Sequence, residues 1–257
     1  MSATGLSDPH FYAQSLRENA KILRVGNFTN AAKILEDVAN RIELDSLSSQ
    51  FLEESYKGFE AAILQEYSKE KWELDIFNDV DAIITKGSPA FKDALRLLRN
   101  TVEPQTICNT IFQLAKSQQD ITTHVHLLCY SYLIMIEGVY GNVMRFLYAY
   151  HVKKSRVTTK LWKIAEEFVK DGTASSLLIG WNSTIRNAIA HATYYIDYQN
   201  NMIKFVDKRK TKNIPFGEFL ELVKKAGGVS PAVVVDLILR ILVPLNFAEV
   251  KQVSSIS

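Results

Sequence analysis

The sequence contains few of the residues that are typical of disulfide-rich or turn-rich proteins. Its 257 residues include 11 glycines and 6 prolines, too few for a β-sandwich with many tight turns. The two cysteines, Cys108 and Cys129, both lie in apolar segments. We therefore expect two buried thiols in a reducing compartment rather than a disulfide framework.

Long apolar runs are also missing. The most apolar segment, residues 127–136, is about half as long as a bilayer requires, and Glu137 follows it. Asp236 and Arg240 interrupt the other apolar segment, at 233–245. The first residues lack the basic stretch followed by an apolar one that is typical of a secretory signal. We expect a soluble, cytoplasmic protein with no membrane contact.

Charge is distributed unevenly along the chain. The net charge is only +2, but residues 1–103 carry −5 and residues 104–257 carry +7. This asymmetry either arose by chance or indicates that the C-terminal part meets an anion such as a phosphate backbone.

Hydrophobic spacing predicts helices over most of the chain. In residues 31–42, for example, apolar side chains recur every three or four positions. Charge and composition change at the turn 101–104, which is the expected domain boundary. We predict an N-terminal helical domain at residues 1–103 that senses or regulates, and a helical bundle at residues 104–257.

Several helix boundaries can be predicted in the second domain. A long helix over 121–151 is apolar on most faces, and Gly138 and Gly141 would let another helix approach it closely. The following helix should end at Gly172. At the C-terminus we expect two separate helices, the second starting at residues 230–231, where proline follows serine.

A change of pattern follows the helix that ends near residue 191. Aromatic and aliphatic side chains alternate with polar ones from Tyr194 onward and again after Ile203, which predicts a β-hairpin turning at Asn200–Asn201. The segment 207–213 is expected to be a basic loop. The predicted fold class is therefore all-α, a helical bundle with one small β-hairpin after the motif helix.

The chemistry of the chain is concentrated in one helix end, Arg186-Asn187-Ala188-Ile189-Ala190-His191. Asn187 and His191 are four residues apart and lie on one helix face, whereas Arg186 lies further round the helix. One copy supplies one base, one amide and one guanidinium. Two copies around a two-fold axis would supply two of each to one cleft.

This R-N-x-x-x-H pattern resembles the signature of the HEPN (higher eukaryotes and prokaryotes nucleotide-binding) superfamily. The surrounding residues LIGWNSTIRNAIAHATYYIDY are similar to its bacterial members, and the resemblance covers roughly residues 105–250. It implies a helical bundle that forms a homodimer with a composite active site. It further implies a metal-independent endoribonuclease of a toxin–antitoxin, abortive-infection or anti-phage defence system, with a cognate antitoxin or defence-system partner. Some members carry a tyrosine two residues after the histidine; Thr193 stands there, so we do not expect regulation by modification of such a tyrosine.

The residue types suit cleavage of RNA by its own 2′-hydroxyl. His191 has the side chain whose ordinary pKa lies near neutrality, so it can act as base or acid. Arg186 would stabilise the phosphorane, and Asn187 would position His191, Arg186 or the phosphate. No cofactor and no metal are expected. Glu137, which suits the family's acidic position on a facing helix, either supports this site or forms a structural salt bridge.

The remaining candidates are open to two interpretations. Tyr194 and Tyr195 either stack on a base or pack within the hairpin. Two groups of basic residues either contact RNA phosphates or are merely solvated. These groups are Lys153, Lys154 and Arg156, and Lys208, Arg209, Lys210 and Lys212.

We therefore expect an RNA-cleaving homodimer. The first alternative is a catalytically inactive dimer that binds RNA or a nucleotide, or that bridges subunits of a larger complex. The second is a purely structural helical scaffold.

Overall fold

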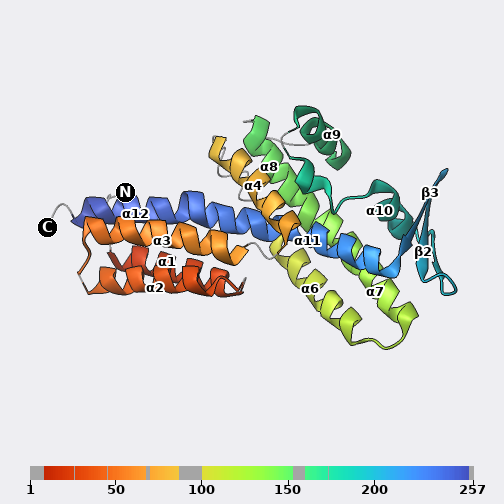
Figure 1. The fold of residues 1–257 in the computed structure, drawn as a ribbon, viewed down its shortest axis with the longest axis horizontal. Helices are drawn as coiled ribbons and strands as arrows, with labels where there is room; N and C mark the ends of the chain where they lie inside the picture. The colour runs from red at the N-terminus through yellow and green to blue at the C-terminus, as the bar shows by residue number, and fades with distance from the viewer. Residues whose placement is uncertain are drawn as a thin grey trace, which may run out of the picture. The chain divides into compact units, whose positions relative to one another are not determined.

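A computed structural model describes residues 9–25, 27–44, 46–67, 70–86, 100–152, 160–172 and 174–254. Within these ranges the chain is mostly helical and contains one three-stranded antiparallel sheet, which confirms the predicted helical class (Figure 1). The chain divides into two compact units. The N-terminal unit is Met1–Leu74 with Val234–Ser257, and the central unit is Asp75–Val233. This division differs from the predicted boundary at 103/104.

The N-terminal unit packs helices from both ends of the sequence. Its first helix contacts the second and the last, and its third helix contacts the second and the last. Leu16, Leu35 and Phe59 are fully buried between them. The elements are α1 (Pro9–Val25), α2 (Thr29–Glu43), α3 (Ser49–Tyr67), the π-helical turn η3 (Ile238–Leu242) and α12 (Val243–Ser254).

The central unit surrounds the long apolar helix. Its described helices are α4 (Lys71–Lys86), whose first residues belong to the N-terminal unit, α6 (Val102–Ser117), α7 (Ile121–Ile134), the π-helical turn η1 (Met135–Tyr140), α8 (Gly141–Val152), α9 (Leu161–Asp171), the 3-10 turn η2 (Ser175–Leu178), α10 (Ser183–Ala190) and α11 (Phe216–Leu237). As predicted, the helix after α8 ends at Gly172, whose φ is 64°.

The predicted helix 121–151 is interrupted by the π-helical turn η1. The turn contains Glu137 and Gly138. A Cβ on Gly138 would lie 2.6 Å from Cβ of Pro104, so the expected close approach of another helix, α6, is confirmed there. At Gly141 a Cβ would instead lie 3.2 Å from Nη1 of Arg145. This second glycine therefore leaves room for an arginine of its own helix.

The predicted start of a helix at residues 230–231 is wrong. Helix α11 continues through Pro231 without a break. Val229 and Val233, on either side of the proline, are fully buried. Burying each valine contributes about 1.5–3 kcal/mol, which offsets the roughly 3 kcal/mol that proline costs inside a helix.

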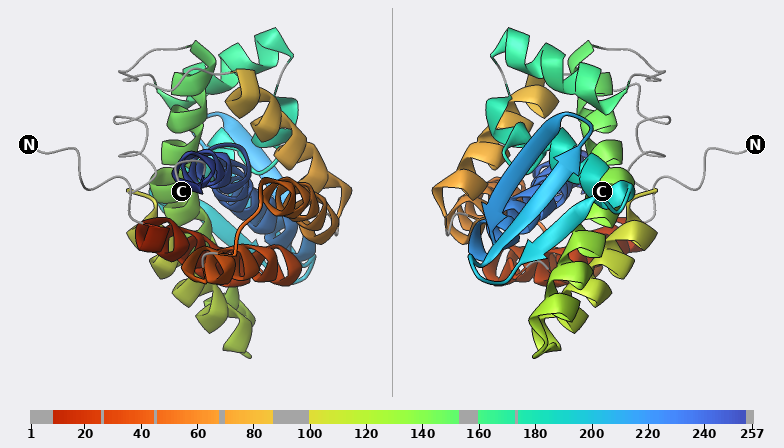
Figure 2. Two further views of the ribbon diagram at one scale, coloured as in Figure 1. Left: turned by 90° about the vertical axis from the view of Figure 1, so that its left-hand side faces the viewer. Right: turned by 90° about the vertical axis from the view of Figure 1, so that its right-hand side faces the viewer.

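The predicted hairpin is part of a larger sheet with the order β1-β2-β3 (Figure 2, right). Asn201 has a φ of 51°, as expected for the turn at Asn200–Asn201. The expected loop 207–213 is wrong, because it forms a second turn and most of a third strand. The strands are β1 (Tyr194–Asp197), β2 (Met202–Asp207) and β3 (Lys210–Pro215).

Two helical stretches, Ile121–His151 and Phe216–Val250, are long and apolar enough to cross a membrane. More than half of the most apolar window of each is buried inside the protein. Core helices of soluble proteins pass the same test, so length and composition give only weak support for a membrane span.

Candidate functional site

Two buried tyrosines fix the start of the motif helix α10. The hydroxyl of Tyr140 donates to the Leu177 carbonyl at 2.6 Å, and that of Tyr132 donates to the Gly180 carbonyl at 3.1 Å. Tyr132 also accepts the backbone N–H of Asn182 at 3.0 Å. Burial raises the pKa of both phenols, so they remain neutral donors.

These hydrogen bonds hold residues 177–182, which we call the anchored loop, and helix α10 begins directly after it. The side-chain oxygen of Asn182 accepts the N–H of Ile185 at 3.1 Å, which is an N-cap. Gly180 lies so close to helix α11 that a Cβ would come within 2.2 Å of the Ala226 nitrogen. The loop is therefore held by hydrogen bonds on one side and by backbone packing on the other.

The end of α10 turns the chain sharply into the sheet. His191 is the C-terminal cap, and Ala192 follows with a φ of 53°. The N–H of Ala192 bonds to Ile189 at 3.1 Å, and that of Thr193 bonds to Ala188 at 2.8 Å, which is a Schellman ending. The N–H of Val206 then bonds to the Thr193 carbonyl at 2.9 Å. Thr193 thus links the helix end to β2.

Four polar side chains, those of Glu137, Arg186, Asn187 and Asp207, are connected by hydrogen bonds across the motif, and we call this series the polar chain. Nε of Arg186 donates to Glu137, and Nη1 of Arg186 donates to Oδ1 of Asn187 at 2.7 Å. Nδ2 of Asn187 donates to Oδ2 of Asp207 at 2.8 Å. The side chains of Arg186 and Glu137 are 37% and 48% exposed. The structure therefore brings three predicted residues together and adds Asp207, which the sequence did not single out.

His191 is not part of this chain of side-chain contacts. Its backbone N–H bonds to the Asn187 carbonyl at 3.0 Å, and the residue is exposed. Its imidazole makes no hydrogen bond to any residue that the structure describes. The ring is therefore available to an external ligand, although no contact joins it to Arg186 within one chain.

The two candidate tyrosines point to opposite faces of the sheet. The hydroxyl of Tyr194 lies 2.7 Å from Nδ1 of His126, and its ring packs 6.0 Å from that of Phe205. Burial raises the pKa of Tyr194, so it is a packing residue. Tyr195 is 63% exposed on the outer face. Of the two tyrosines, Tyr195 is the one free to stack on a base.

The basic candidates of the sheet are all exposed. Lys208 and Arg209 form the turn between β2 and β3, and Lys210 and Lys212 lie on β3. Lys210 pairs with Asp207 in the strand register, so both lie on the same face. The other three predicted basic residues, Lys153, Lys154 and Arg156, lie outside the described residues. Among those that are described, no group of three or more His, Cys, Asp or Glu side chains could hold a metal ion.

A cavity of about 340 Å³ lies beside the polar chain. Glu137, Arg186 and Asn187 contribute to its wall. Four further lining residues could bind a ligand, and the sequence did not single them out. These are Arg145, Lys160, Trp162 and Trp181. No motif connects these residues, because they come from a helix interior, a helix start and a loop. The only sequence signal that could have indicated Trp162 and Trp181 is the scarcity of tryptophan in the chain.

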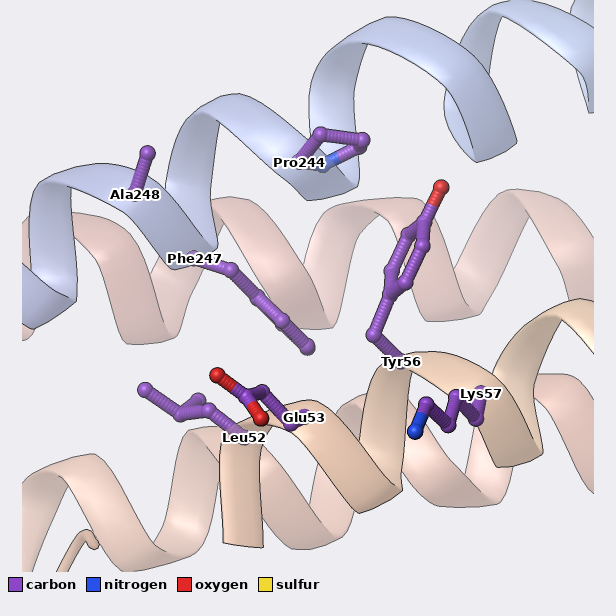
Figure 3. A pocket seen from close by; sticks show the side chains of 7 residues that line it. All are labelled: Leu52, Glu53, Tyr56, Lys57, Pro244, Phe247 and Ala248. Atoms are coloured by element: carbon purple, nitrogen blue, oxygen red, sulfur yellow. The ribbon is translucent and has the colours of Figure 1, made fainter. Parts of the chain in front are cut away.

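The N-terminal unit contains a second cavity of about 340 Å³ between α3 and α12 (Figure 3). The rings of Tyr56 and Phe247 both point into it and lie 6.2 Å apart. Leu52, Pro244 and Ala248 make most of the remaining wall apolar, and Glu53 and Lys57 complete it. None of the motif residues contributes to this cavity.

Comparisons with protein-family models, with curated proteins and with solved structures found no match to the chain. The candidate site is therefore defined by the residues described above and by their geometry.

Proposed function

We propose that the protein is a metal-independent endoribonuclease of the HEPN type that cleaves RNA by attack of the 2′-hydroxyl. The observation that supports this most strongly is the polar chain from Glu137 to Asp207. It orients Arg186 and Asn187 on the helix that ends at the exposed, unbonded imidazole of His191. A buried or internally bonded histidine would have argued against the proposal.

The proposed reaction needs a base, an acid and positive charge. The 2′-oxygen attacks phosphorus while its proton passes to an imidazole, and the bond from phosphorus to the 5′-oxygen breaks as that oxygen receives a proton. The products are a 2′,3′-cyclic phosphate and a 5′-hydroxyl. Two of the five N–H groups of Arg186 are bonded within the described protein, so up to three remain for phosphate oxygens.

The requirement for both base and acid supports a homodimer. One chain offers only His191 at the end of the motif helix, and two copies around a two-fold axis would place two imidazoles in one cleft. In this arrangement one His191 accepts the 2′-hydroxyl proton and the other donates to the leaving oxygen. Asn187, held by Asp207, keeps the guanidinium of Arg186 in place.

The test uses the full-length protein with a 5′-labelled single-stranded RNA in EDTA. Cleavage should persist in EDTA and leave cyclic phosphate ends. It should fall about 10²–10³-fold in Arg186→Ala, as expected for loss of one transition-state donor, and at least as far in His191→Ala. Arg24→Ala and His10→Ala, both in the N-terminal unit, are the matched controls and should cleave normally. An RNA that is 2′-O-methylated throughout should resist cleavage.

Cleavage that persists in both motif variants, or that proceeds on the methylated RNA, would refute the proposed mechanism. RNA binding without any product would favour the alternative of an inactive binding dimer. The proposed biological role is that of an effector in a bacterial defence or toxin system. Expression in bacteria should then arrest growth, and His191→Ala should relieve the arrest.

A further inference from the structure

The cavity beside the polar chain carries more positive charge than the proposed cleavage chemistry uses. Arg145, Lys160 and Arg186 line it together with a single carboxylate, that of Glu137. Arg186 is paired with that carboxylate. Arg145 and Lys160 make no ion pair or hydrogen bond with any described side chain. A guanidinium and an ammonium without an anion are available to form charge-assisted hydrogen bonds with a ligand that supplies one.

The fold makes specific room for Arg145. A Cβ at Gly141, one turn earlier in the helix, would lie 3.2 Å from Nη1 of Arg145. The guanidinium therefore rests on the backbone of the helix that follows the π-helical turn. That turn also carries Glu137, the partner of Arg186. Arg145 and Arg186 thus line one cavity from two different helices.

Two tryptophans add flat apolar surface to the same cavity. Trp162 and Trp181 are two of only three tryptophans in the chain. Trp162 is 45% exposed, which is unusual for the largest apolar side chain. Exposed aromatic rings beside cations are the combination on which the bases of single-stranded nucleic acids stack.

We infer that this cavity is a nucleotide subsite for single-stranded RNA. This inference rests on the proposed function, since it takes RNA as the ligand. Trp162 stacks on one base, while Arg145 and Lys160 bind a phosphate of the same strand. The strand then continues to the phosphate at Arg186, which shares the cavity. Duplex RNA does not fit this arrangement, because its bases are already stacked on each other.

The experiment measures binding in a His191→Ala background, so that no RNA is consumed. The probe is a 12-nucleotide single-stranded RNA, and the readouts are tryptophan quenching and fluorescence anisotropy of a labelled copy. Trp162→Ala should weaken binding by roughly 5- to 100-fold, the range for loss of one stacked base. Trp72→Ala, in the N-terminal unit, is the matched control and should bind normally.

Arg145→Ala tests the phosphate contact separately. Removing one phosphate contact should lower the slope of log K against log salt concentration by about 0.7 for a single strand. Lys116→Ala, which removes an exposed lysine of α6 outside the cavity, should leave the slope unchanged. Circular dichroism and the melting temperature show that each variant is folded. Trp162→Phe, which keeps a ring, should retain most of the affinity.

Binding that is unaffected by both Trp162→Ala and Arg145→Ala would overturn the subsite, even if cleavage by the wild-type protein stands. Equal affinity for the duplexed probe would also overturn it. Adenosine monophosphate could also quench tryptophan fluorescence in a saturable way. If RNA did not displace it, the cavity would be a site for a free nucleotide, and the RNA assignment would be overturned. Variant-sensitive binding without any cleavage by the wild type would support the subsite and refute the proposed nuclease.

Discussion

The two compact units of the protein use charged side chains in different ways. In the N-terminal unit three arginines are paired with carboxylates of neighbouring helices: Arg17 with Glu43, Arg24 with Glu36 and Arg240 with Glu60. In the central unit Arg145 and Lys160 line the cavity without a carboxylate partner among the described residues. Arg186 is paired with Glu137, and both of these side chains are partly exposed to solvent. These arginines of the first unit are neutralised by the fold, whereas Arg145 and Lys160 in the cavity of the second remain available to an anion.

The cavities of the two units differ in the same way. The cavity between α3 and α12 is mostly apolar, with Tyr56 and Phe247 packed edge to face, and its charged lining residues are Glu53 and Lys57. The cavity beside α10 combines rings with cations and a carboxylate. The two cavities have similar volumes but different linings. Among the described residues, the first has one cation and one carboxylate, whereas the second has three cations and one carboxylate, so the second suits a phosphate-bearing ligand better.

Substituting one arginine in each unit tests this contrast most strongly. Arg240 pairs with Glu60 and lies 3.9 Å from the fully buried Asp236. Arg240→Ala should lower the free energy of unfolding by about 3–5 kcal/mol, because it leaves a buried carboxylate without its cation. Denaturant unfolding measures this loss, and RNA affinity of the folded fraction should be unchanged.

Arg145→Ala should give the opposite result, with unfolding free energy unchanged and RNA affinity reduced. Adding Asp236→Asn to Arg240→Ala should restore part of the lost stability, since the buried charge is then removed as well. If Arg145→Ala destabilises the protein as much as Arg240→Ala does, the distinction between structural and available charge is wrong.

A glycine in each unit provides the second test. Gly180→Ala would push a Cβ to 2.2 Å from the backbone of α11, so we expect a loss of about 1–3 kcal/mol in unfolding free energy. Gly58→Ala, in the middle of α3, meets only Cδ1 of Ile34 at 3.7 Å. It should stabilise by roughly 0.5–1 kcal/mol through helix propensity. Opposite signs in thermal unfolding would confirm that the anchored loop is built on close backbone contact.

The sequence predicted the parts of the site that depend on local pattern. The motif helix, its polar end and the turn at Asn200–Asn201 follow from spacing over a few residues. The continuous helix through Pro231 was not predictable in this way, because buried neighbours outweigh the local preference of proline. The third strand was missed because Lys210–Pro215 lacks alternating apolar residues and is ordered by pairing with β2.

The cavity was out of reach of sequence reasoning for a different reason. Arg145, Lys160 and Trp181 are separated by up to 36 positions and meet only because α8, α9 and the anchored loop converge. The π-helical turn that carries Glu137 adds a local shift that no apolar spacing reveals. The sequence left two roles open for Glu137, support of the site or a structural salt bridge. Its pairing with Arg186 combines the two, because this salt bridge is itself part of the candidate site.

Asp207 provides a third test, of positioning rather than of charge. It accepts the hydrogen bond of Asn187, which in turn accepts one from Arg186. Asp207→Ala should lower kcat for RNA cleavage about 10-fold, or about 1.4 kcal/mol, with KM little changed. Asp197→Ala, at the end of β1, is the matched control and should leave kcat unchanged.

A double-variant cycle separates this role from a general loss of structure. If Asp207 acts through Asn187, then Asn187→Ala combined with Asp207→Ala should be no slower than Asn187→Ala alone. Fully additive losses would show that Asp207 acts independently of the amide, and the chain of contacts would then have no functional meaning beyond Asn187.

The smallest expected effect concerns the residue after His191. Ala192 has a left-handed backbone with φ of 53°, which costs a non-glycine residue about 1–2 kcal/mol. Ala192→Gly should therefore raise the unfolding free energy by roughly 1 kcal/mol, after allowing for glycine's greater freedom in the unfolded chain. Ala190→Gly, in the last turn of the same helix, should lower it by a similar amount. If both changes destabilise, the helix does not end in the left-handed turn that directs His191 out of the bundle.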